Sequence, residues 1–202
     1  MSVVKNRVIR LLGNKIWIGK EHGFSFSANF DYIIFDLNTN NIRYGNIEDI
    51  KQYIKQKISF IEINNEKIQA KNMLLKRIGL LVFKKSNLKA FFLSDSFFPK
   101  KYLLLDFRKN KFLNTDDILD VAKYISENYD IRIDFEMFKQ MFEKIENAYK
   151  LKNVSYDSIL AFCLWKCSNL RQNDVSNLIG ISDMIIRIWR RRFENLNFVS
   201  FV

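Results

Sequence analysis

The chain of 202 residues is long enough, and apolar enough, to form a packed core, and it carries a strong positive charge. Its hydrophobic fraction is 48%, its formal net charge is +11, and it contains 6 Gly and 1 Pro. These values exclude a globally disordered chain and a low-complexity linker. One large domain or two small ones fit this length. The many Ile, Lys, Asn and Phe residues are typical of AT-rich genomes, such as those of many viruses and some archaea.

The positive charge is unevenly distributed along the chain. Residues 1–116 hold 21 of the 33 basic residues but only 10 of the 22 acidic ones. Residues 117–202 contain equal numbers of basic and acidic residues. Within this second part, residues 158–202 are again locally basic. A polyanionic partner such as nucleic acid explains both basic regions most simply. Charge that serves only solubility is the alternative.

The sequence predicts neither a metal centre nor a cofactor. Cys163 and Cys167 lie four residues apart in an expected helix, so we interpret them as core side chains of a protein in a reducing cytoplasm. With His22 as the single histidine, a zinc ion would need distant carboxylates as ligands. No apolar run approaches the ~20 residues that span a bilayer, and the N-terminus has no signal-peptide pattern. We therefore expect an intracellular protein, in the cytoplasm or nucleoid, or in a host cell if it is viral.

Residues 1–113 are predicted to form a basic β-rich domain of unknown fold. Apolar runs with strand propensity are separated by polar turns at 38–41 and 108–111. The Ile residues of 47–57 recur at helical spacing instead, which predicts a short helix there. The predicted strands cover 15–19, 31–37, 42–45, 58–63, 67–70, 78–83, 89–93 and 102–107. The sequence does not indicate their order in a sheet.

From Asn114 onward the apolar period changes from two to nearly four, which predicts an all-α domain over 114–202. Thr115 or Asp116 can cap a first helix that ends near residue 128, and Asp134 can cap a second that ends near residue 150. A third, very apolar helix starts near residue 155 and ends at 167. Two more helices follow. The predicted fold class is therefore α+β, with a β-rich domain followed by five helices.

Residues 171–196 have the pattern of a helix-turn-helix. Gly180 stands where the first helix must end in a sharp turn, and glycine adopts a positive φ without strain. Ser182 or Asp183 can cap the second helix. This helix carries Arg187, Arg190, Arg191 and Arg192, whose fixed charge suits phosphates and guanine edges. The alternative is a helical hairpin whose arginines are simply solvated.

The helix-turn-helix also matches a known pattern without a gap, at Gln172, Val175, Gly180, Ile181, Ile186 and Arg187, with Ser176 in place of a small alanine. On these residues the segment resembles the second cyclin-like repeat of the archaeal and eukaryotic transcription factor B family. The resemblance implies a cyclin-like domain that enters the major groove of a promoter element beside the TATA box.

Carried over by position, the resemblance places Met184 and Arg187 at base-reading positions. Arg190, Arg191 and Arg192 would hold phosphates, which position the helix without specifying sequence. Gln172 and Ser182 complete the expected DNA-binding residues. The zinc ribbon of the family has no counterpart here, and a β-rich 1–113 leaves no room for a second cyclin-like repeat. The sequence therefore predicts one such repeat fused to an unrelated domain, not a complete initiation factor.

The leading functional hypothesis is a DNA-binding transcription regulator. Its expected partners are duplex DNA and, further, RNA polymerase or other transcription proteins or a second copy of the chain, with no membrane partner. One alternative is a nucleic-acid-processing enzyme, for which Asp31, Asp36, Glu62 and Glu66 lie on or beside predicted strands. Ordinary strand-end and turn carboxylates explain them better, and we assign no catalytic residue. The other alternative is a protein-interaction module, which an exposed Phe97, Phe98 and 198–202 tail would suit. The same residues would equally suit a position over the core.

Overall fold

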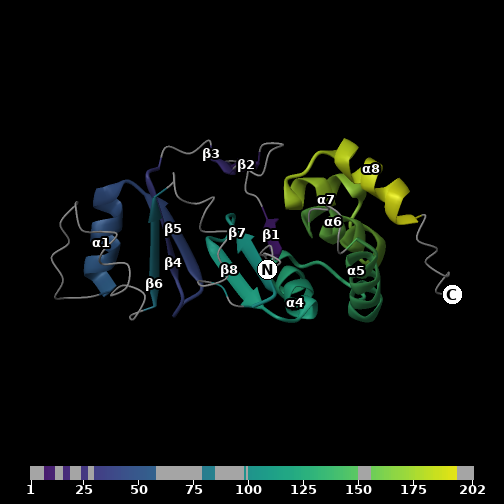
Figure 1. Ribbon diagram of the computed structural model, residues 1–202, viewed down its shortest axis with the longest axis horizontal. Coiled ribbons are helices and arrows are strands. Elements are labelled where there is room, and N and C mark those ends of the chain that lie inside the picture. Colours follow the sequence, from purple (N-terminus) through teal and green to yellow (C-terminus); the bar gives the residue numbers. More distant parts are fainter. Residues whose placement is uncertain are drawn as a thin grey trace, which may run out of the picture.

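A computed structural model shows an α+β protein in which a sheet is followed by helices (Figure 1), so the predicted α+β class is confirmed. The structure describes residues 7–11, 16–18, 24–26, 30–57, 79–84, 98, 100–149 and 156–194. The predicted strands at 58–63, 67–70 and 89–93 lie outside these residues, as do Glu62, Glu66, Phe97 and the 198–202 tail.

The main sheet has six strands in the order β1-β7-β8-β5-β4-β6. Its members are β1 (Arg7–Leu11), β4 (Tyr32–Asp36), β5 (Asn41–Gly45), β6 (Leu80–Lys84), β7 (Tyr102–Asp106) and β8 (Lys111–Thr115). β1 runs parallel to β7, and the other neighbours are antiparallel. A separate antiparallel pair is formed by β2 (Ile16–Ile18) and β3 (Phe24–Phe26).

The sequence did not predict β8. Its first residue, Lys111, was assigned to a turn, and the helical period was expected to begin at Asn114. Phe112 and Leu113 are its only large apolar residues, so alternation is too short to detect. Backbone pairing with all five residues of β7 holds this segment in the extended conformation of a strand. The boundary predicted between residues 113 and 114 falls inside the strand.

Two parts of the chain repeat one β-hairpin–helix motif. The first comprises β4, β5 and α1 (Ile47–Lys57), and the second comprises β7, β8 and α4 (Ile118–Tyr129). Tyr, Asp and Asn recur at equivalent positions of the two hairpins, as Tyr32, Asp36 and Asn40 and as Tyr102, Asp106 and Asn110. Both Asn residues are left-handed, with φ of 54° and 53°. Asn tolerates this conformation better than other side chains, so it suits the last position of each turn.

In the first motif, the buried Asp36 carboxylate holds the hairpin turn to the helix. It accepts hydrogen bonds from the amides of Asn38 at 3.0 Å and Thr39 at 3.3 Å, and from the Tyr53 hydroxyl of α1 at 2.7 Å. Burial raises the pKa of Tyr53 to about 12, with help from its bond to Asp36. Burial also acts to raise the pKa of Asp36, but the hydrogen bonds, led by that from Tyr53, outweigh it and lower this pKa.

The buried Asp106 carboxylate holds the hairpin turn to the helix in the second motif. It accepts from the amides of Arg108 and Lys109, both at 3.0 Å. The hydroxyls of Tyr124 at 2.9 Å and Tyr129 at 2.7 Å, both on α4, donate to it as well. Burial and these bonds raise the pKa of both tyrosines, which stay protonated donors. Each aspartate therefore fixes its turn and ties the following helix to the sheet.

The two hairpins meet across an approximate two-fold axis. The Ile42 amide donates to the Asn110 carbonyl at 2.7 Å, and the equivalent Phe112 amide donates to the Asn40 carbonyl at 2.9 Å. Asn41 and Lys111 face each other between these bonds. The outer strands break the symmetry, because β6 is antiparallel to β4 whereas β1 is parallel to β7.

Both faces of the sheet are buried. α1 covers Ile34 with Ile50 and Ile54, whereas Leu104 joins the large core shared by α4 and the later helices. On the opposite face Phe98 is buried, with its ring 5.4 Å from that of Phe35. Of the two alternatives for Phe98, exposure or a place over the core, the structure shows the second, because this face of the sheet supplies an aromatic cluster that covers it.

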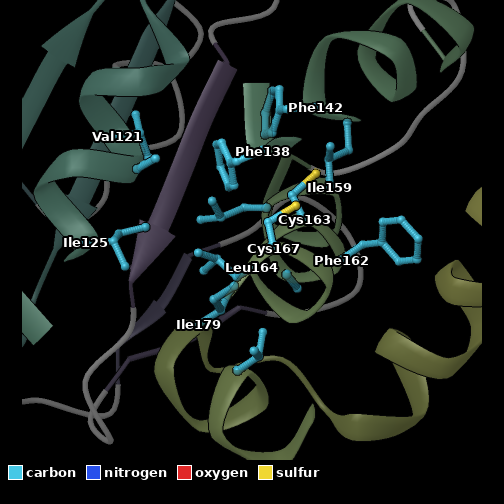
Figure 2. Close-up of a cluster of buried hydrophobic side chains, with 14 of the residues drawn as sticks. Val121, Ile125, Phe138, Phe142, Ile159, Phe162, Cys163, Leu164, Cys167 and Ile179 are labelled. Carbon is cyan, nitrogen blue, oxygen red and sulfur yellow. The ribbon is translucent and has the colours of Figure 1, made fainter. Parts of the chain in front are cut away.

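Four further helices follow α4. They are α5 (Phe135–Tyr149), α6 (Tyr156–Cys167), α7 (Gln172–Ile179) and α8 (Asp183–Glu194). α6 lies at the centre and is buried along almost its whole length, with α5, α7 and α8 packed around it (Figure 2). Cys163 and Cys167 are buried free cysteines, as predicted. Five helices in 114–202 also agree with the sequence.

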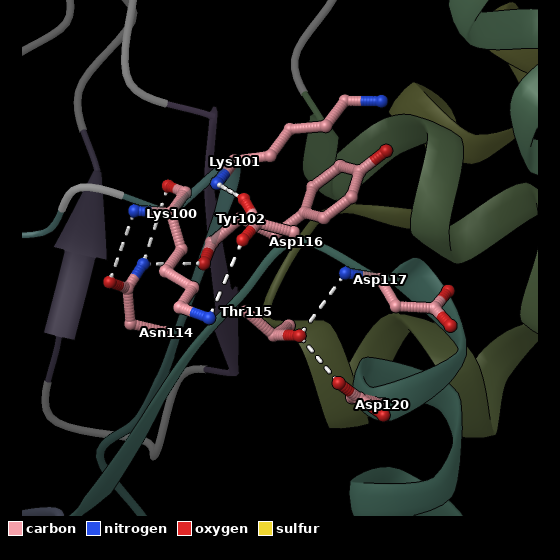
Figure 3. A network of polar contacts seen from close by, with 8 residues as sticks. All are labelled: Lys100, Lys101, Tyr102, Asn114, Thr115, Asp116, Asp117 and Asp120. Atoms are coloured by element: carbon pink, nitrogen blue, oxygen red, sulfur yellow. Dashed lines mark hydrogen bonds and ion pairs between the residues drawn. The ribbon is translucent and has the colours of Figure 1, made fainter.

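The helix cap of α4 differs from the prediction. Asp117 is the N-cap, and its side chain accepts from the Leu119 amide at 3.0 Å. Thr115 instead donates to Asp120, and Asp116 accepts from the Lys101 amide at 2.9 Å (Figure 3). The cap is displaced because β8 extends to Thr115 and uses both predicted caps to close the strand–helix junction.

A buried carboxylate joins the second hairpin to the helices. Glu146 of α5 accepts from Lys101 and Tyr102, each at 3.0 Å, and from Tyr156 of α6 at 2.9 Å. A buried carboxylate is stable only when it is hydrogen-bonded and paired in this way. The second hairpin therefore contacts α5 and α6 directly in this region.

The Asp36 network predicts a pH-dependent stability. At neutral pH, Asp36→Asn should lower the free energy of unfolding by about 1–3 kcal/mol, because a charged acceptor of several hydrogen bonds is lost. Since the folded-state pKa of Asp36 is depressed, its stabilisation is present above the unfolded-state pKa and disappears as the pH falls through the folded-state value. Urea unfolding at neutral pH and at about pH 3 measures this.

The matched control is Asp31→Asn, since Asp31 is exposed and lies just before the same strand. It removes the same charge and should leave stability nearly unchanged. An Asp36→Asn deficit that is equally large at both pH values would contradict the assignment.

Candidate nucleic-acid interface

α7 and α8 form the predicted helix-turn-helix. Gly180 ends α7 with φ of 77°, the left-handed conformation that the sequence called for. The Ser176 hydroxyl donates to the Ile181 carbonyl across the turn. Ser182 precedes α8, and its hydroxyl accepts from the Ile185 amide at 3.4 Å. Ser176 and Gly180 therefore fix the direction in which the chain passes from the turn into α8.

Buried apolar side chains hold the two helices on α6. Val175, Leu178 and Ile179 of α7 are buried, as are Ile186 and Phe193 of α8. The Phe193 ring lies 5.2 Å from that of Phe162 in α6. α8 is thus anchored along one face, and its other face points to solvent.

The solvent face of α8 combines apolar and basic side chains. Met184 is 67% exposed and Ile188 44%, and Arg187 and Arg191 are also exposed. These four residues follow the i, i+3, i+4, i+7 spacing of one helical face. We call them the outer stripe. Ile188 was not among the predicted DNA-binding residues, although its position one residue after Arg187 and four after Met184 already places it on this face.

The four arginines fall into two groups. Arg190 stacks on Trp165 of α6 at 4.6 Å and bonds to Glu194 at 3.1 Å. Arg192 lies over Trp189 at 4.8 Å. Arg187 and Arg191 belong to the outer stripe instead. Arg190 is therefore tied to α6, whereas Arg187, Arg191 and Arg192 are exposed to solvent.

Trp165 and Glu194 connect the ends of α6 and α8. Lys166 lies over Trp165 at 4.1 Å and pairs with Glu194 at 3.1 Å, so the indole and the carboxylate each contact two cations. Desolvation acts to raise the pKa of Glu194, but bonds from Lys166 and Arg190 lower it overall. The carboxylate therefore stays charged and fixes the C-terminal end of α8.

The other predicted residues lie at the start of α8. Gln172 donates from its side-chain amide to the Asp183 carboxylate, which also pairs with Arg187 at 2.8 Å. This chain of contacts links the first turn of α7 to the first turn of α8. Gln172 and Ser182 thus have intramolecular contacts at the helix-turn-helix junction, beside Met184.

Of the carboxylates considered for an enzyme, the structure describes Asp31 and Asp36, and these two do not form a shared site. Asp36 is fully buried and bonded to its own turn, and Asp31 is exposed just before β4. Within the described ranges, no three His, Cys, Asp or Glu side chains lie close enough to hold a metal ion. In the same part of the chain, no helix combines the length and apolarity needed to cross a bilayer.

Comparisons with known protein families, curated proteins and solved structures found no match to this chain.

The division of the arginines predicts different consequences for stability. Arg190→Ala should lower the free energy of unfolding by about 1 kcal/mol, since it removes the stacking on Trp165 and the pair with Glu194. Arg191→Ala should change it by less than about 0.5 kcal/mol, because the side chain is exposed. Urea unfolding of both variants measures this. Equal losses would show that Arg190 does not fasten α8 to α6.

Proposed function

We propose that the protein is a DNA-binding transcription regulator that places α8 in the major groove of duplex DNA. The observation that carries this proposal is the outer stripe of α8, which presents two arginines and two apolar side chains to solvent. The major groove admits an α-helix and offers guanine acceptors and thymine methyl groups. Arginine suits the former, and Met184 and Ile188 suit the latter.

The ion pair of Arg187 does not prevent base reading. Arg187 and Asp183 form an i, i+4 pair, and the arginine side chain is 72% exposed. Exposed helical pairs contribute about 0.3–0.5 kcal/mol, whereas a bidentate contact to guanine contributes about 1–3 kcal/mol. It is therefore favourable for the Arg187 side chain to leave Asp183 and bind a guanine base. Until DNA binds, the pair limits the motion of the Arg187 side chain.

We infer that Arg190 serves mainly to hold α8, because it stacks on Trp165 of α6 and pairs with Glu194. Arg191 and Arg192 are both exposed, and they are then the arginines of this cluster that are available for a phosphate or a base. Gln172 and Ser182 support the start of α8 and lie where an adjacent phosphate could contact them.

We also propose that α4–α8 form a cyclin-like repeat similar to that of the transcription factor B family. The five helices α4–α8, with the buried α6 among them and the helix-turn-helix at the end, support this assignment. RNA polymerase or another transcription protein is a candidate partner on the same basis. The direct packing of α4 on the sheet through Asp106 distinguishes this chain from a free-standing repeat.

The test is DNA binding by the full chain after selection from a random duplex library. Arg187→Ala and Arg191→Ala should each weaken binding about 5-fold to 100-fold, because a base or phosphate contact is lost. Lys123→Ala, on the exposed side of α4, is the control and should bind as the wild type does. Binding should also weaken steeply with salt; a flat salt dependence would contradict the proposal.

The apolar residues of α8 favour a second candidate, docking of α8 on another protein. Met184, Ile185 and Ile188 are all large hydrophobics exposed to solvent, and such patches mark interaction sites. The DNA affinity of the arginine variants distinguishes DNA binding from docking on a protein. If Arg187→Ala and Arg191→Ala both leave DNA affinity unchanged, a protein partner is favoured.

A further inference from the structure

The two hairpin turns of the repeated motif have the same backbone conformation, but their side chains differ in charge. Both have a buried Asp at the start and a left-handed Asn at the end. Asn38, Thr39 and Asn41 of the first hairpin correspond to Arg108, Lys109 and Lys111 of the second. Three neutral positions are thus basic in the second turn. Because the two turns fold in the same way, the added charge is not required by the hairpin itself.

The basic turn is also the one that contacts the helix-turn-helix. The Arg108 guanidinium donates to the Asn177 carbonyl in the last turn of α7. Carbonyls at the end of a helix lack intrahelical partners and attract cations. Arg108 therefore holds the hairpin against the end of α7, directly before the Gly180 turn that leads into α8 and the outer stripe.

Lys109 and Lys111 are exposed on the same turn. The Lys109 ammonium lies 5.5 Å from the centre of the Tyr129 ring, and its own amide is bonded to Asp106. Lys111 pairs through its backbone with Asn41 and Asp106. Both side chains therefore extend from a rigid base, so little backbone freedom is lost when they bind a ligand.

We propose that the β7–β8 turn is a second DNA contact, in which Lys109 and Lys111 bind the phosphate backbone beside the groove occupied by α8. The proposal rests on the DNA-binding function proposed above. Lysines on a turn next to a recognition helix fix its register through phosphates, which carry no base information. The turn also explains how part of the basic excess of residues 1–116 acts together with the helix-turn-helix.

The test is a double variant that gives the second turn the residues of the first, Lys109→Thr with Lys111→Asn. Arg108 is kept, so the contact with α7 is preserved. Each phosphate contact contributes about 0.9 to the slope of log K against log salt concentration. We expect the slope to fall by about 2 and affinity at low salt to fall about 10-fold or more, with an unchanged base preference.

The control is Lys55→Gln with Lys123→Gln, which removes the same charge from exposed positions on α1 and α4. α1 lies on the far side of the sheet from α7 and α8 in Figure 1. The control should keep the wild-type slope. Urea midpoints of all variants check that the fold is retained.

The outcomes separate this inference from the proposed function. If Arg187→Ala weakens binding but the turn variant keeps the wild-type slope, the second contact is wrong and DNA binding by α8 stands. If the turn variant and its control lose equal slope, the effect is one of net charge, and the second contact is again wrong. If the wild-type chain binds no duplex with salt-dependent affinity, both proposals fail.

Discussion

The buried carboxylate of Asp106 is the interaction on which the arrangement of this protein depends. It accepts two amides from the β7–β8 turn and the hydroxyls of Tyr124 and Tyr129 from α4. A carboxylate without water around it must be fully hydrogen-bonded, so turn, strand and helix can adopt one relative position only. Arg108 then extends from the same turn to α7. Asp106 and Arg108 therefore help to fix the position of the helix-turn-helix relative to the sheet, together with the apolar core that the two share.

The repeated motif shows which parts of this arrangement are structural. Asp36 in the first hairpin makes the equivalent contacts to its turn and to Tyr53, so an aspartate with a tyrosine is the common means of joining hairpin and helix. What differs between the motifs is the surface. The first turn is neutral and the second basic, and the second donates a hydrogen bond to α7 through Arg108. Differences between two equivalent structural units are informative about function because the fold is held constant.

α8 shows a similar division within a single helix. Its inner residues pack on α6, and Arg190 and Glu194 fix its end through Trp165 and Lys166. Its outer stripe combines positive charge with exposed apolar surface, which the fold does not need. A rigidly held helix loses little conformational entropy on binding, so exposed residues on such a helix are well suited to recognition.

Much of the architecture could be predicted from the sequence alone. The hairpin at 31–45, α1, the five helices and the Gly180 turn follow from local periodicity and capping, which need only neighbouring residues. β8 and the cap at Asp117 did not follow, because pairing with β7 decides them. The repeat of Tyr, Asp and Asn was present in the sequence, but its meaning depends on hydrogen bonds to helices seventeen or more residues away. The sequence likewise determined that α8 carries four arginines. Only the tertiary structure decided that Arg190 stacks on Trp165 while Arg187 and Arg191 face solvent, because that division depends on where α6 lies.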